Sequence, residues 1–392
     1  MQRRIAILGS TGSIGENALR IVADHPDRFR AVALAAGRNW GRLAEQARAF
    51  RPRIVSVADP ADAERVRALA PSGTVVLSGE EGLSEVAAGA GADVVLSALV
   101  GAAGLSPTLA AIEAGASVAL ANKEVLVMAG ELVTARARRR GLGLLPVDSE
   151  HAGVAQALAG RPGTEVRRVV LTASGGPFRT LPLGSMSEVT PEEALQHPNW
   201  KMGPKITVDS ATMMNKGFEL IEARWLFGLD PDRVDVVVHP QSIVHAMVEF
   251  VDGSVLAQMS VPDMRISIAH AMSYPERIPL RVPYLDIVEV GALTFEEPDP
   301  ARFPCLAHAR VALREGGTAP AVVNAANEVA VASFLENAAR FTDIPAVVGA
   351  ALEAHEGSPA GDLDSILAAD RWAREFAACL LNGRNPKVRR WA

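Results

Sequence analysis

Residues 4–24 read RIAILGSTGSIGENALRIVAD, and this stretch predicts how the first part of the chain folds. Residues 4–8 have the apolar pattern of a short buried strand, residues 9–15 form a G-x-x-G-x-x-G turn, and a helical pattern continues to about Asp24. Gly12 lets the backbone approach a pyrophosphate, whose charge the N–H groups of the helix start complement. The order strand, glycine-rich turn, helix therefore predicts nucleotide binding; the alternative is a tight turn without a ligand.

The second predicted strand, residues 31–35, indicates which nucleotide this is. A domain that prefers NAD usually places an acidic residue near the end of this strand to bind the ribose 2′-hydroxyl. Residues 31–41 contain no carboxylate, and Gly37 is followed by Arg38 and Asn39, which offer a positive charge and a donor. This pattern favours the 2′-phosphate of NADPH, the alternative being a solvated arginine in a loop.

Alternation of strand and helix patterns continues through the first third of the chain. Further strands are predicted at residues 54–57, 74–77, 93–98, 117–121 and 142–147. This alternation predicts an α/β fold with an open parallel sheet. Ligands bind at the carboxyl edge of such sheets, so Asn122, Lys123 and Glu124, directly after a strand, are site candidates. Ordinary surface chemistry is the alternative.

Two carboxylates follow the last of these strands, with a serine between them: Asp148, Ser149 and Glu150. If the backbone stays extended, side chains two residues apart point to the same side and the carboxylates converge. Convergent carboxylates can hold a hard divalent cation or share acid–base chemistry. The alternative is a strand end followed by a solvated turn.

A long loop with weak periodicity is predicted at about residues 175–204. It contains HPNWKMG at residues 197–203, with Trp200 in its middle. Long loops of compact domains are often lids, and an apolar side chain on a lid can shield a ligand from water. Trp200 is interpreted as a lid residue; the alternative is a core tryptophan that holds the loop in place.

Residues 207–223, TVDSATMMNKGFELIEA, predict a helix that Asp209 or Ser210 caps and that runs toward Phe227. On such a helix Asn215, Lys216 and Glu219 share one face.

Ser210, Asn215 and Lys216 are residue types that bind phosphate. Glu219 cannot bind an anion, so its presence among them suggests a cation, with Asp148 and Glu150 as further ligands. Oxygen ligands alone favour Mg²⁺ or Mn²⁺ over zinc.

Composition excludes several classes of protein. The 392 residues carry a net charge of −6, with 49% hydrophobic and 21% charged residues, and no broad basic surface is indicated. Nucleic acid is therefore not expected as a partner. No stretch approaches the roughly 18 apolar residues of a membrane span, and the two cysteines lack metal or disulfide spacing. We expect a cytoplasmic protein without a membrane partner.

Eight motifs give the chain a resemblance to a known family along nearly its whole length. They are GSTGSIG (9–15), ANKE (121–124), VDSE (147–150), ASGGPF (173–178), HPNWKMG (197–203), VDSATMMNKGFE (208–219), HPQSIVH (239–245) and NAANEVAV (324–331). With them the sequence closely resembles the 1-deoxy-D-xylulose 5-phosphate reductoisomerases, NADPH- and divalent-metal-dependent enzymes of non-mevalonate isoprenoid biosynthesis.

The resemblance implies site residues. It implies metal ligation by Asp148, Glu150 and Glu219, and catalytic roles for these three and Lys123. It implies substrate contacts from Lys123, Ser149, Glu150, Ser174, His197, Ser210, Asn215, Lys216 and Glu219. It implies NADPH contacts from Thr11, Gly12, Ser13, Ile14, Gly37, Arg38, Asn39, Asn122, Glu124 and Gly203. Trp200 and Met202 would lie on the lid.

The resemblance also implies domains, an assembly and a reaction. The expected parts are an NADPH domain (1–147) with a Rossmann-like, doubly wound parallel sheet, a central α+β catalytic and dimerisation domain (148–275), a linker (276–300) and a helical C-terminal domain (301–392) of a homodimer. The expected product is 2-C-methyl-D-erythritol 4-phosphate. The alternatives are another NADP-dependent oxidoreductase, such as a semialdehyde dehydrogenase, for which Cys305 and Cys379 lie in poor contexts, and a non-enzymatic NADPH-sensing regulator.

Overall fold

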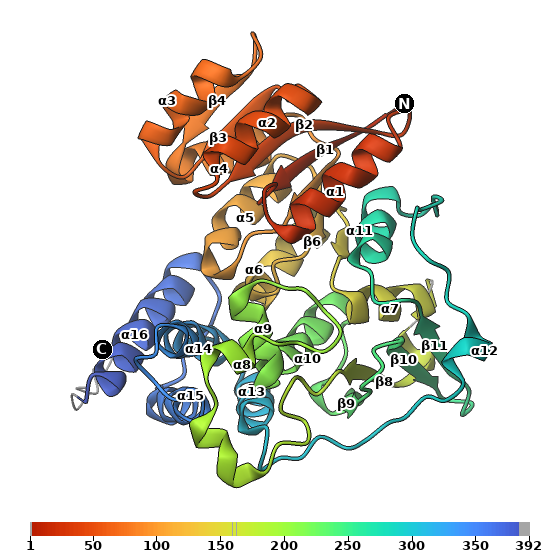
Figure 1. The fold of residues 1–392 in the computed structure, drawn as a ribbon, viewed down its shortest axis with the longest axis vertical. Helices are drawn as coiled ribbons and strands as arrows, with labels where there is room; N and C mark the ends of the chain where they lie inside the picture. Colours follow the sequence, from red (N-terminus) through yellow and green to blue (C-terminus); the bar gives the residue numbers. More distant parts are fainter. Residues whose placement is uncertain (1, 159, 162, 384–392) are drawn as a thin grey trace. The chain divides into compact units, whose positions relative to one another are not determined.

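The computed structural model describes residues 2–158, 160, 161 and 163–383, so the last part of the predicted C-terminal domain, residues 384–392, lies outside the described chain. The described chain forms two compact units. Among the described residues, the first comprises residues 2–125, 133–152 and 263–283, and the second comprises residues 126–132, 153–262 without 159 and 162, and 284–383. Figure 1 colours the chain along its sequence, which allows the segments of each unit to be followed.

The first unit contains a sheet of seven parallel strands in the order β4-β3-β2-β1-β5-β6-β7. Its strands are β1 (Arg3–Leu8), β2 (Phe29–Ala36), β3 (Ile54–Val57), β4 (Val75–Ser78), β5 (Val94–Ser97), β6 (Ser117–Leu120) and β7 (Leu144–Pro146). The chain moves outward from β1 to β4 and then returns to the other side of β1 with β5. The predicted doubly wound sheet is confirmed, and its strand order reverses at β1.

Helices follow the strands of this sheet. They are α1 (Ser13–Asp24), α2 (Trp40–Phe50), α3 (Pro60–Leu69), α4 (Gly79–Ala88), η1 (Gly101–Gly104), α5 (Leu105–Glu113), α6 (Glu124–Arg139), α7 (Ser149–Leu158) and, much later in the chain, α11 (Met264–Ser273). Helix α1 packs against α11, α2 against α3, and α4 against α5. One apolar core joins the sheet to α1, α2, α3 and α11, and Ile5, Leu34 and Leu96 are completely buried in it.

The second unit contains a mixed four-stranded sheet in the order β11-β10-β8-β9. Its strands are β8 (Val166–Ala173), β9 (Val234–Val238), β10 (Val244–Phe250) and β11 (Val255–Met259). Strand β8 pairs in parallel with β9 and antiparallel with β10, which pairs antiparallel with β11. A mixed sheet with helices matches the predicted α+β character of the catalytic part.

Helices make up the rest of the second unit. They are η2 (Gly163–Glu165), η3 (Leu183–Glu188), α8 (Pro191–Ala194), α9 (Pro204–Ala211), α10 (Met214–Phe227), η4 (Pro231–Arg233), α12 (Ile287–Val290), α13 (Pro304–Glu315), α14 (Ala319–Leu335), α15 (Asp343–Ala354) and α16 (Leu363–Leu381). Helix α14 packs against α13, α15 and α16, and the second apolar core runs from β8 into these helices. The described part of the predicted C-terminal domain, residues 301–383, is thus helical, as predicted. Among the described residues, no helix has the length and apolar content needed to cross a membrane.

Two local predictions were wrong. Extended backbone does not continue through Glu150, because α7 begins at Ser149. The helix predicted from Asp209 or Ser210 is two helices, α9 and α10, separated at Met213, which has a left-handed backbone (φ 58°).

The compact units also divide the chain differently from the expected domains. Residues 148–152 and 263–275, which the prediction gave to the catalytic domain, pack with the first unit. Helix α6 passes through both units, with residues 126–132 in the second and a non-helical kink at Ala129.

Candidate active site

The glycine-rich turn after β1 needs its glycines for packing. Gly9 has φ 86°, and a Cβ there would lie 2.4 Å from the carbonyl oxygen of Ala98. A Cβ on Gly15 would lie 2.3 Å from the carbonyl oxygen of Gly9, so helix α1 starts in direct contact with the turn. A Cβ on Gly12 would meet only that same oxygen, at 3.4 Å, and Gly12 is exposed. The turn is thus closed toward the protein and open toward solvent, as a pyrophosphate site requires.

Gly12 is also the N-cap of α1, and within the described chain no side chain makes a capping hydrogen bond there. The first N–H groups of the helix therefore remain available to an anion. Arg38 and Asn39 lie at the carboxyl end of β2, next to β1 in the sheet, and are exposed. Asn39 caps α2 by accepting a hydrogen bond from the backbone N–H of Arg42 over 3.3 Å. The dinucleotide candidates thus share one edge of one sheet.

Asn122, Lys123 and Glu124 lie between β6 and α6 and are at most 5% exposed. The amide nitrogen of Asn122 donates to Glu124 Oε2 over 2.7 Å and to the carbonyl oxygen of Gly101 over 3.2 Å. A Cβ on Gly104 would lie 1.9 Å from Asn122 Oδ1. Asn122 therefore fixes the short helix η1 at the same edge of the sheet.

Lys123 pairs with Asp148. Its Nζ lies 2.8 Å from Asp148 Oδ2, and the two side chains are 6% and 19% exposed. Burial alone would raise the pKa of Asp148, but the Lys123 ammonium and His151, whose Nδ1 lies 3.7 Å away, hold this pKa well below its usual range. Asp148 is therefore an ionised carboxylate at physiological pH.

Ser149 and Glu150 are linked to Asp148 by hydrogen bonds, but the backbone that carries them differs from the predicted extended one. Asp148 Oδ1 accepts a hydrogen bond from the backbone N–H of Ser149 over 3.2 Å, and the Ser149 hydroxyl donates to Glu150 Oε2. Glu150 lies in the first turn of α7. The helix start, and not an extended strand, sets the positions of the two carboxylates, both of which are partly exposed.

In the second unit, Ser174 and His197 come together although 23 residues separate them. His197 Nδ1 accepts hydrogen bonds from the backbone N–H groups of Asn199 (3.1 Å) and Trp200 (3.0 Å), so this nitrogen carries no proton. Burial lowers the pKa of His197 to about 4, so the ring is neutral and its proton is on Nε2. That nitrogen donates to Ser174 Oγ over 2.9 Å.

Ser174 Oγ also accepts a hydrogen bond from the backbone N–H of Gly176 over 3.2 Å. Because its oxygen accepts two bonds, the hydroxyl proton is left to donate elsewhere, as a phosphate ligand does. Gly176 has φ 65°, and a Cβ there would lie 2.9 Å from the carbonyl oxygen of Ser210. The loop that carries Ser174 therefore approaches the end of α9, where Ser210 lies.

Asn215, Lys216 and Glu219 share one face of α10, as predicted. Asn215 Nδ2 donates to Glu219 Oε1 over 2.7 Å, and Lys216 Nζ forms an ion pair with Glu219 Oε2. Glu219 is completely buried and Lys216 is 3% exposed. Asn215 and Lys216 therefore already bond to the Glu219 carboxylate. Its part in a metal site stays a prediction.

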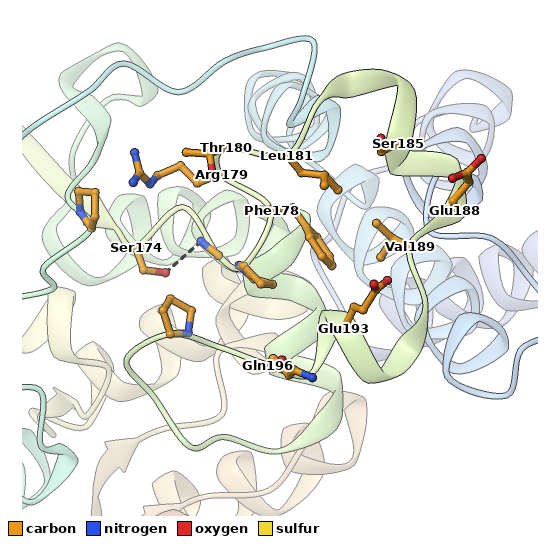
Figure 2. Close-up of a pocket in the computed structure, with 14 residues that line it drawn as sticks. Ser174, Phe178, Arg179, Thr180, Leu181, Ser185, Glu188, Val189, Glu193 and Gln196 are labelled. Atoms are coloured by element: carbon orange, nitrogen blue, oxygen red, sulfur yellow. Dashed lines mark hydrogen bonds between the residues drawn. The ribbon is translucent and has the colours of Figure 1, made fainter.

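A cavity of about 640 Å³ adjoins Ser174. Figure 2 shows the apolar Phe178, Leu181 and Val189 and the polar Glu188, Glu193 and Gln196 around it. Except for Ser174, none of these residues was predicted for the site. They belong to the predicted lid segment, whose sequence has too little periodicity to show which side chains face inward.

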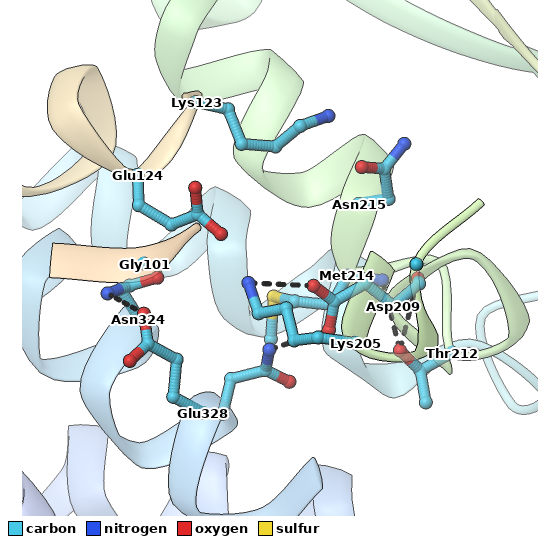
Figure 3. Close-up of polar contacts among 12 residues, drawn as sticks. Gly101, Lys123, Glu124, Lys205, Asp209, Thr212, Met214, Asn215, Asn324 and Glu328 are labelled. Carbon is cyan, nitrogen blue, oxygen red and sulfur yellow. Dashed lines mark hydrogen bonds and ion pairs between the residues drawn. The ribbon is translucent and has the colours of Figure 1, made fainter. Parts of the chain in front are cut away.

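Asp209, which was predicted to be a possible helix cap, is instead a buried structural anion. Its carboxylate pairs with Lys205 Nζ over 2.9 Å and accepts from Asn327 Nδ2 over 2.7 Å (Figure 3). Asn327 belongs to the NAANEVAV motif on α14 and is completely buried. This contact fastens α9, which ends beside the proposed phosphate residues, to the C-terminal helices. No local sequence pattern indicates it, because 118 residues separate the partners.

Three family models match the chain. They are described as 1-deoxy-D-xylulose 5-phosphate reductoisomerase (residues 5–130), its C-terminal domain (residues 144–227) and DXP reductoisomerase C-terminal domain (residues 259–376). Relatives named 1-deoxy-D-xylulose 5-phosphate reductoisomerase occur in Anaeromyxobacter dehalogenans (57% identical, covering 96% of each chain) and Prosthecochloris aestuarii (55% identical, covering 96% of this chain and 99% of the relative).

Solved structures give the same result. The 1-deoxy-D-xylulose 5-phosphate reductoisomerase of Zymomonas mobilis in complex with NADPH is 44% identical, with a TM-score of 0.91 over 97% of this chain and 99% of that one. A DOX-P reductoisomerase in complex with NADPH, fosmidomycin and magnesium is 43% identical, with a TM-score of 0.92 over 97% and 98%. This chain belongs to the 1-deoxy-D-xylulose 5-phosphate reductoisomerase family.

Proposed function

We propose that the chain converts 1-deoxy-D-xylulose 5-phosphate, NADPH and a proton into 2-C-methyl-D-erythritol 4-phosphate and NADP⁺, with a divalent cation, through the residues named below. As a member of its family it is an NADP-dependent oxidoreductase that acts on a sugar phosphate. One observation carries the proposal for the site. The ionised Asp148, paired with Lys123, lies at the carboxyl edge of the parallel sheet, and the glycine-rich turn follows β1 at the same edge.

Asp148, Glu150 and Glu219 are the proposed ligands of Mg²⁺ or Mn²⁺. Asp148 and Glu150 belong to the first unit and Glu219 to the second. Carboxylate oxygens are the ligands that these hard cations prefer, and Asp148 is held in the charged form that a ligand needs. A cation bound there would polarise the ketone and hydroxyl oxygens of the substrate.

Lys123 and Ser149 are proposed to contact the oxygenated carbons of the substrate. Lys123 supplies a positive charge that is already fixed in place by Asp148, so it can stabilise negative charge on a substrate oxygen without reorganising. The Ser149 hydroxyl is oriented by its bond to Glu150. Both residues would position the substrate while its carbon skeleton rearranges.

The proposed phosphate site combines Ser174, Ser210, Asn215 and Lys216, with His197 beside them. Neutral His197 donates to Ser174 Oγ and leaves the Ser174 proton to donate to a phosphate, and Glu219 orients the donors of Asn215 and Lys216. Hydroxyl, amide and ammonium donors of this kind bind phosphate oxygens strongly.

NADPH is proposed to bind at the turn after β1 and at the edge beside it. The contacts would come from Thr11, Gly12, Ser13, Ile14, Gly37, Arg38, Asn39, Asn122, Glu124 and Gly203. The open, uncapped start of α1 supports the pyrophosphate position, and exposed Arg38 supports the 2′-phosphate position. NADPH would supply the hydride for the second half of the reaction.

The segment of about residues 175–204 is proposed to be a lid that carries Trp200 and Met202. The segment is held at Asn199, whose Nδ2 donates to the carbonyl oxygen of Pro240 over 2.7 Å and to Ser242 Oγ over 2.9 Å. Trp200 and Met202 are only partly buried, and the Trp200 ring lies 6.4 Å from that of His245, centroid to centroid. Closure over the substrate would bury these side chains and exclude water.

A homodimer is proposed through the sheet of the second unit. Strand β11 lies at the end of that sheet, with Val255 53% exposed and Leu256 40% exposed. Tyr284 and Val288 are 90% and 89% exposed. A sheet edge with exposed apolar side chains is a surface that proteins normally cover, and a second copy of the chain would do so. Light scattering tests this: we expect twice 41.3 kDa, and a lighter species for Leu256→Lys.

We also retain the expected division into an NADPH domain, a catalytic domain with a linker, and a helical domain. A cytoplasmic location is proposed because both Cys305 and Cys379 are free thiols, as a reducing compartment keeps them.

The activity is tested by following NADPH oxidation with 1-deoxy-D-xylulose 5-phosphate, with and without a chelator. We expect oxidation that depends on the substrate, stops with the chelator and resumes when Mg²⁺ or Mn²⁺ is added in excess. Oxidation that persists without metal would rule out the metal assignment, and absence of oxidation in all conditions would rule out the reaction.

A further inference from the structure

A chain of hydrogen bonds, buried at its Ser10 end and exposed at its Arg42 end, connects the two parts of the first unit that the proposed function assigns to NADPH. It starts at Ser10, inside the glycine-rich turn, and passes through Gln46 on α2 and Glu16 on α1. It ends at Arg42, in the first turn of α2. None of these four residues belongs to the proposed NADPH contacts.

Both the oxygen and the nitrogen of the Gln46 side-chain amide form hydrogen bonds to the turn. Its Oε1 accepts from the Ser10 hydroxyl over 2.7 Å, and its Nε2 donates to the Ser10 carbonyl oxygen over 2.9 Å. The carbonyl can only accept, which settles the orientation of the amide. Gln46 is 2% exposed and Ser10 is completely buried, so water cannot replace either bond. The backbone of the turn is thereby held at the buried Ser10, whereas Gly12 is exposed.

The second amide proton of Gln46 extends the contact to α1, because Nε2 also donates to Glu16 Oε1 over 2.9 Å. Glu16 lies in the first turn of α1, where its charge would repel a bound pyrophosphate. Arg42 neutralises it through two bonds, Nε to Oε1 over 2.6 Å and a terminal nitrogen to Oε2 over 2.8 Å. These Arg42 bonds are the main reason that the pKa of Glu16 is lowered.

Arg42 is also paired with Glu45 over 2.7 Å. Two carboxylates therefore hold its guanidinium, and Arg38 remains as the nearby cation for a 2′-phosphate. The two arginines thus have different tasks, one in shaping the turn and the other in recognising the phosphate that distinguishes NADPH from NADH.

We propose that Gln46 is a positioning residue for the cofactor: together with Arg42 and Glu16 it sets the conformation and charge of the glycine-rich turn for the pyrophosphate of a dinucleotide. The inference rests on the proposed binding of NADPH at this turn. Gln46 and Arg42 act on the pyrophosphate, which NADPH and NADH share, and Arg38 acts on the 2′-phosphate, which only NADPH carries.

The test is fluorescence titration of the full-length protein with NADPH and with NADH in the absence of substrate. Gln46→Leu keeps the buried volume but removes both bonds to Ser10, and it should raise the Kd of both nucleotides on the order of tenfold. Arg42→Gln should also raise both Kd values. Arg38→Gln should raise the Kd of NADPH alone. Arg48→Gln, on the exposed side of the same helix, is the matched control and should change neither value.

Steady-state kinetics distinguishes positioning from general destabilisation. For Gln46→Leu the KM for NADPH should rise, while the KM for the sugar phosphate substrate and kcat at saturating NADPH should stay within about twofold of wild type. If Gln46→Leu does not fold, Ser10→Ala removes one bond of the same pair and should weaken both nucleotides in the same way. In Gln46→Glu, whose new carboxylate faces Glu16, adding Glu16→Gln should recover part of the lost affinity.

Unchanged Kd values in folded Gln46→Leu, or a loss confined to NADPH, would overturn the inference while leaving the proposed function intact. A rise in the KM for the sugar phosphate equal to that for NADPH would also overturn it. Failure of the wild-type protein to bind NADPH would instead overturn the proposed cofactor site, and the inference with it.

Discussion

The ammonium of Lys123 lies 2.8 Å from the carboxylate of Asp148, and both side chains are largely buried. Removing one partner of such a pair leaves an uncompensated charge in a poorly solvated position. The pair therefore ties folding to the chemistry of the site, because the two groups that would hold the substrate and the metal also hold each other.

Lys123→Met should lower the free energy of unfolding by about 2–4 kcal/mol, since Asp148 loses its partner. Turnover should also be lost. The double variant Lys123→Met/Asp148→Asn removes the unpaired charge as well, and should regain part of the stability without regaining activity. Chemical denaturation measures the first effect and NADPH oxidation the second. Equal stability of wild type and Lys123→Met would show that the pair contributes little to folding.

Glu150→Gln should abolish turnover and leave NADPH affinity nearly unchanged. Glutamine keeps an oxygen that can accept from the Ser149 hydroxyl, so the start of α7 should be retained, but the negative charge that a divalent cation needs is gone. Glu81→Gln, an exposed position on α4, serves as the control. Undiminished turnover in Glu150→Gln would contradict the metal assignment.

His197 should titrate with a pKa of about 4, because burial disfavours the charged ring, against an ordinary value of about 6.5 in the unfolded chain. Between these values the unfolded chain binds more protons. The free energy of unfolding that this group contributes therefore falls as the pH falls from about 6.5 to about 4, and it stays constant at lower pH. Protonation of Nδ1 would also break its bonds from Asn199 and Trp200 in the proposed lid. NMR titration of the ring, assigned with His197→Gln, measures the pKa; a value near 6.5 would refute the expectation.

Gly130→Ala should destabilise the second unit by about 1–3 kcal/mol, because the new methyl group would lie 2.1 Å from the indole ring of Trp225. Both residues belong to that unit, and Gly130 follows the kink of α6 at Ala129. Gly184→Ala is the matched control, since a Cβ there meets nothing within 4 Å. Thermal unfolding compares the two variants. Equal melting temperatures would mean that Trp225 moves aside at no cost.

The sequence by itself predicted those structural features whose physical cause lies in residues close together along the chain. The apolar run of residues 4–8, the glycines of the turn and the missing carboxylate between residues 31 and 41 predicted the parallel sheet and where a nucleotide would bind. Asn215, Lys216 and Glu219 were predicted to share a helix face, and on α10 they do. A strand, a turn or a helix face depends on residues close in sequence, and its pattern can be read without the rest of the chain.

Only the tertiary structure decided which residues far apart in sequence bond to each other and which backbone conformations their surroundings impose. The sequence could not show that Asn327 binds Asp209, that Gln46 holds Ser10, or that His197 sets the proton of Ser174. Nor could it show that a helix begins at Ser149. The motifs determined which side chains are present and on which elements, whereas their ionisation, donors and orientation follow from burial and from contacts that only the folded chain creates.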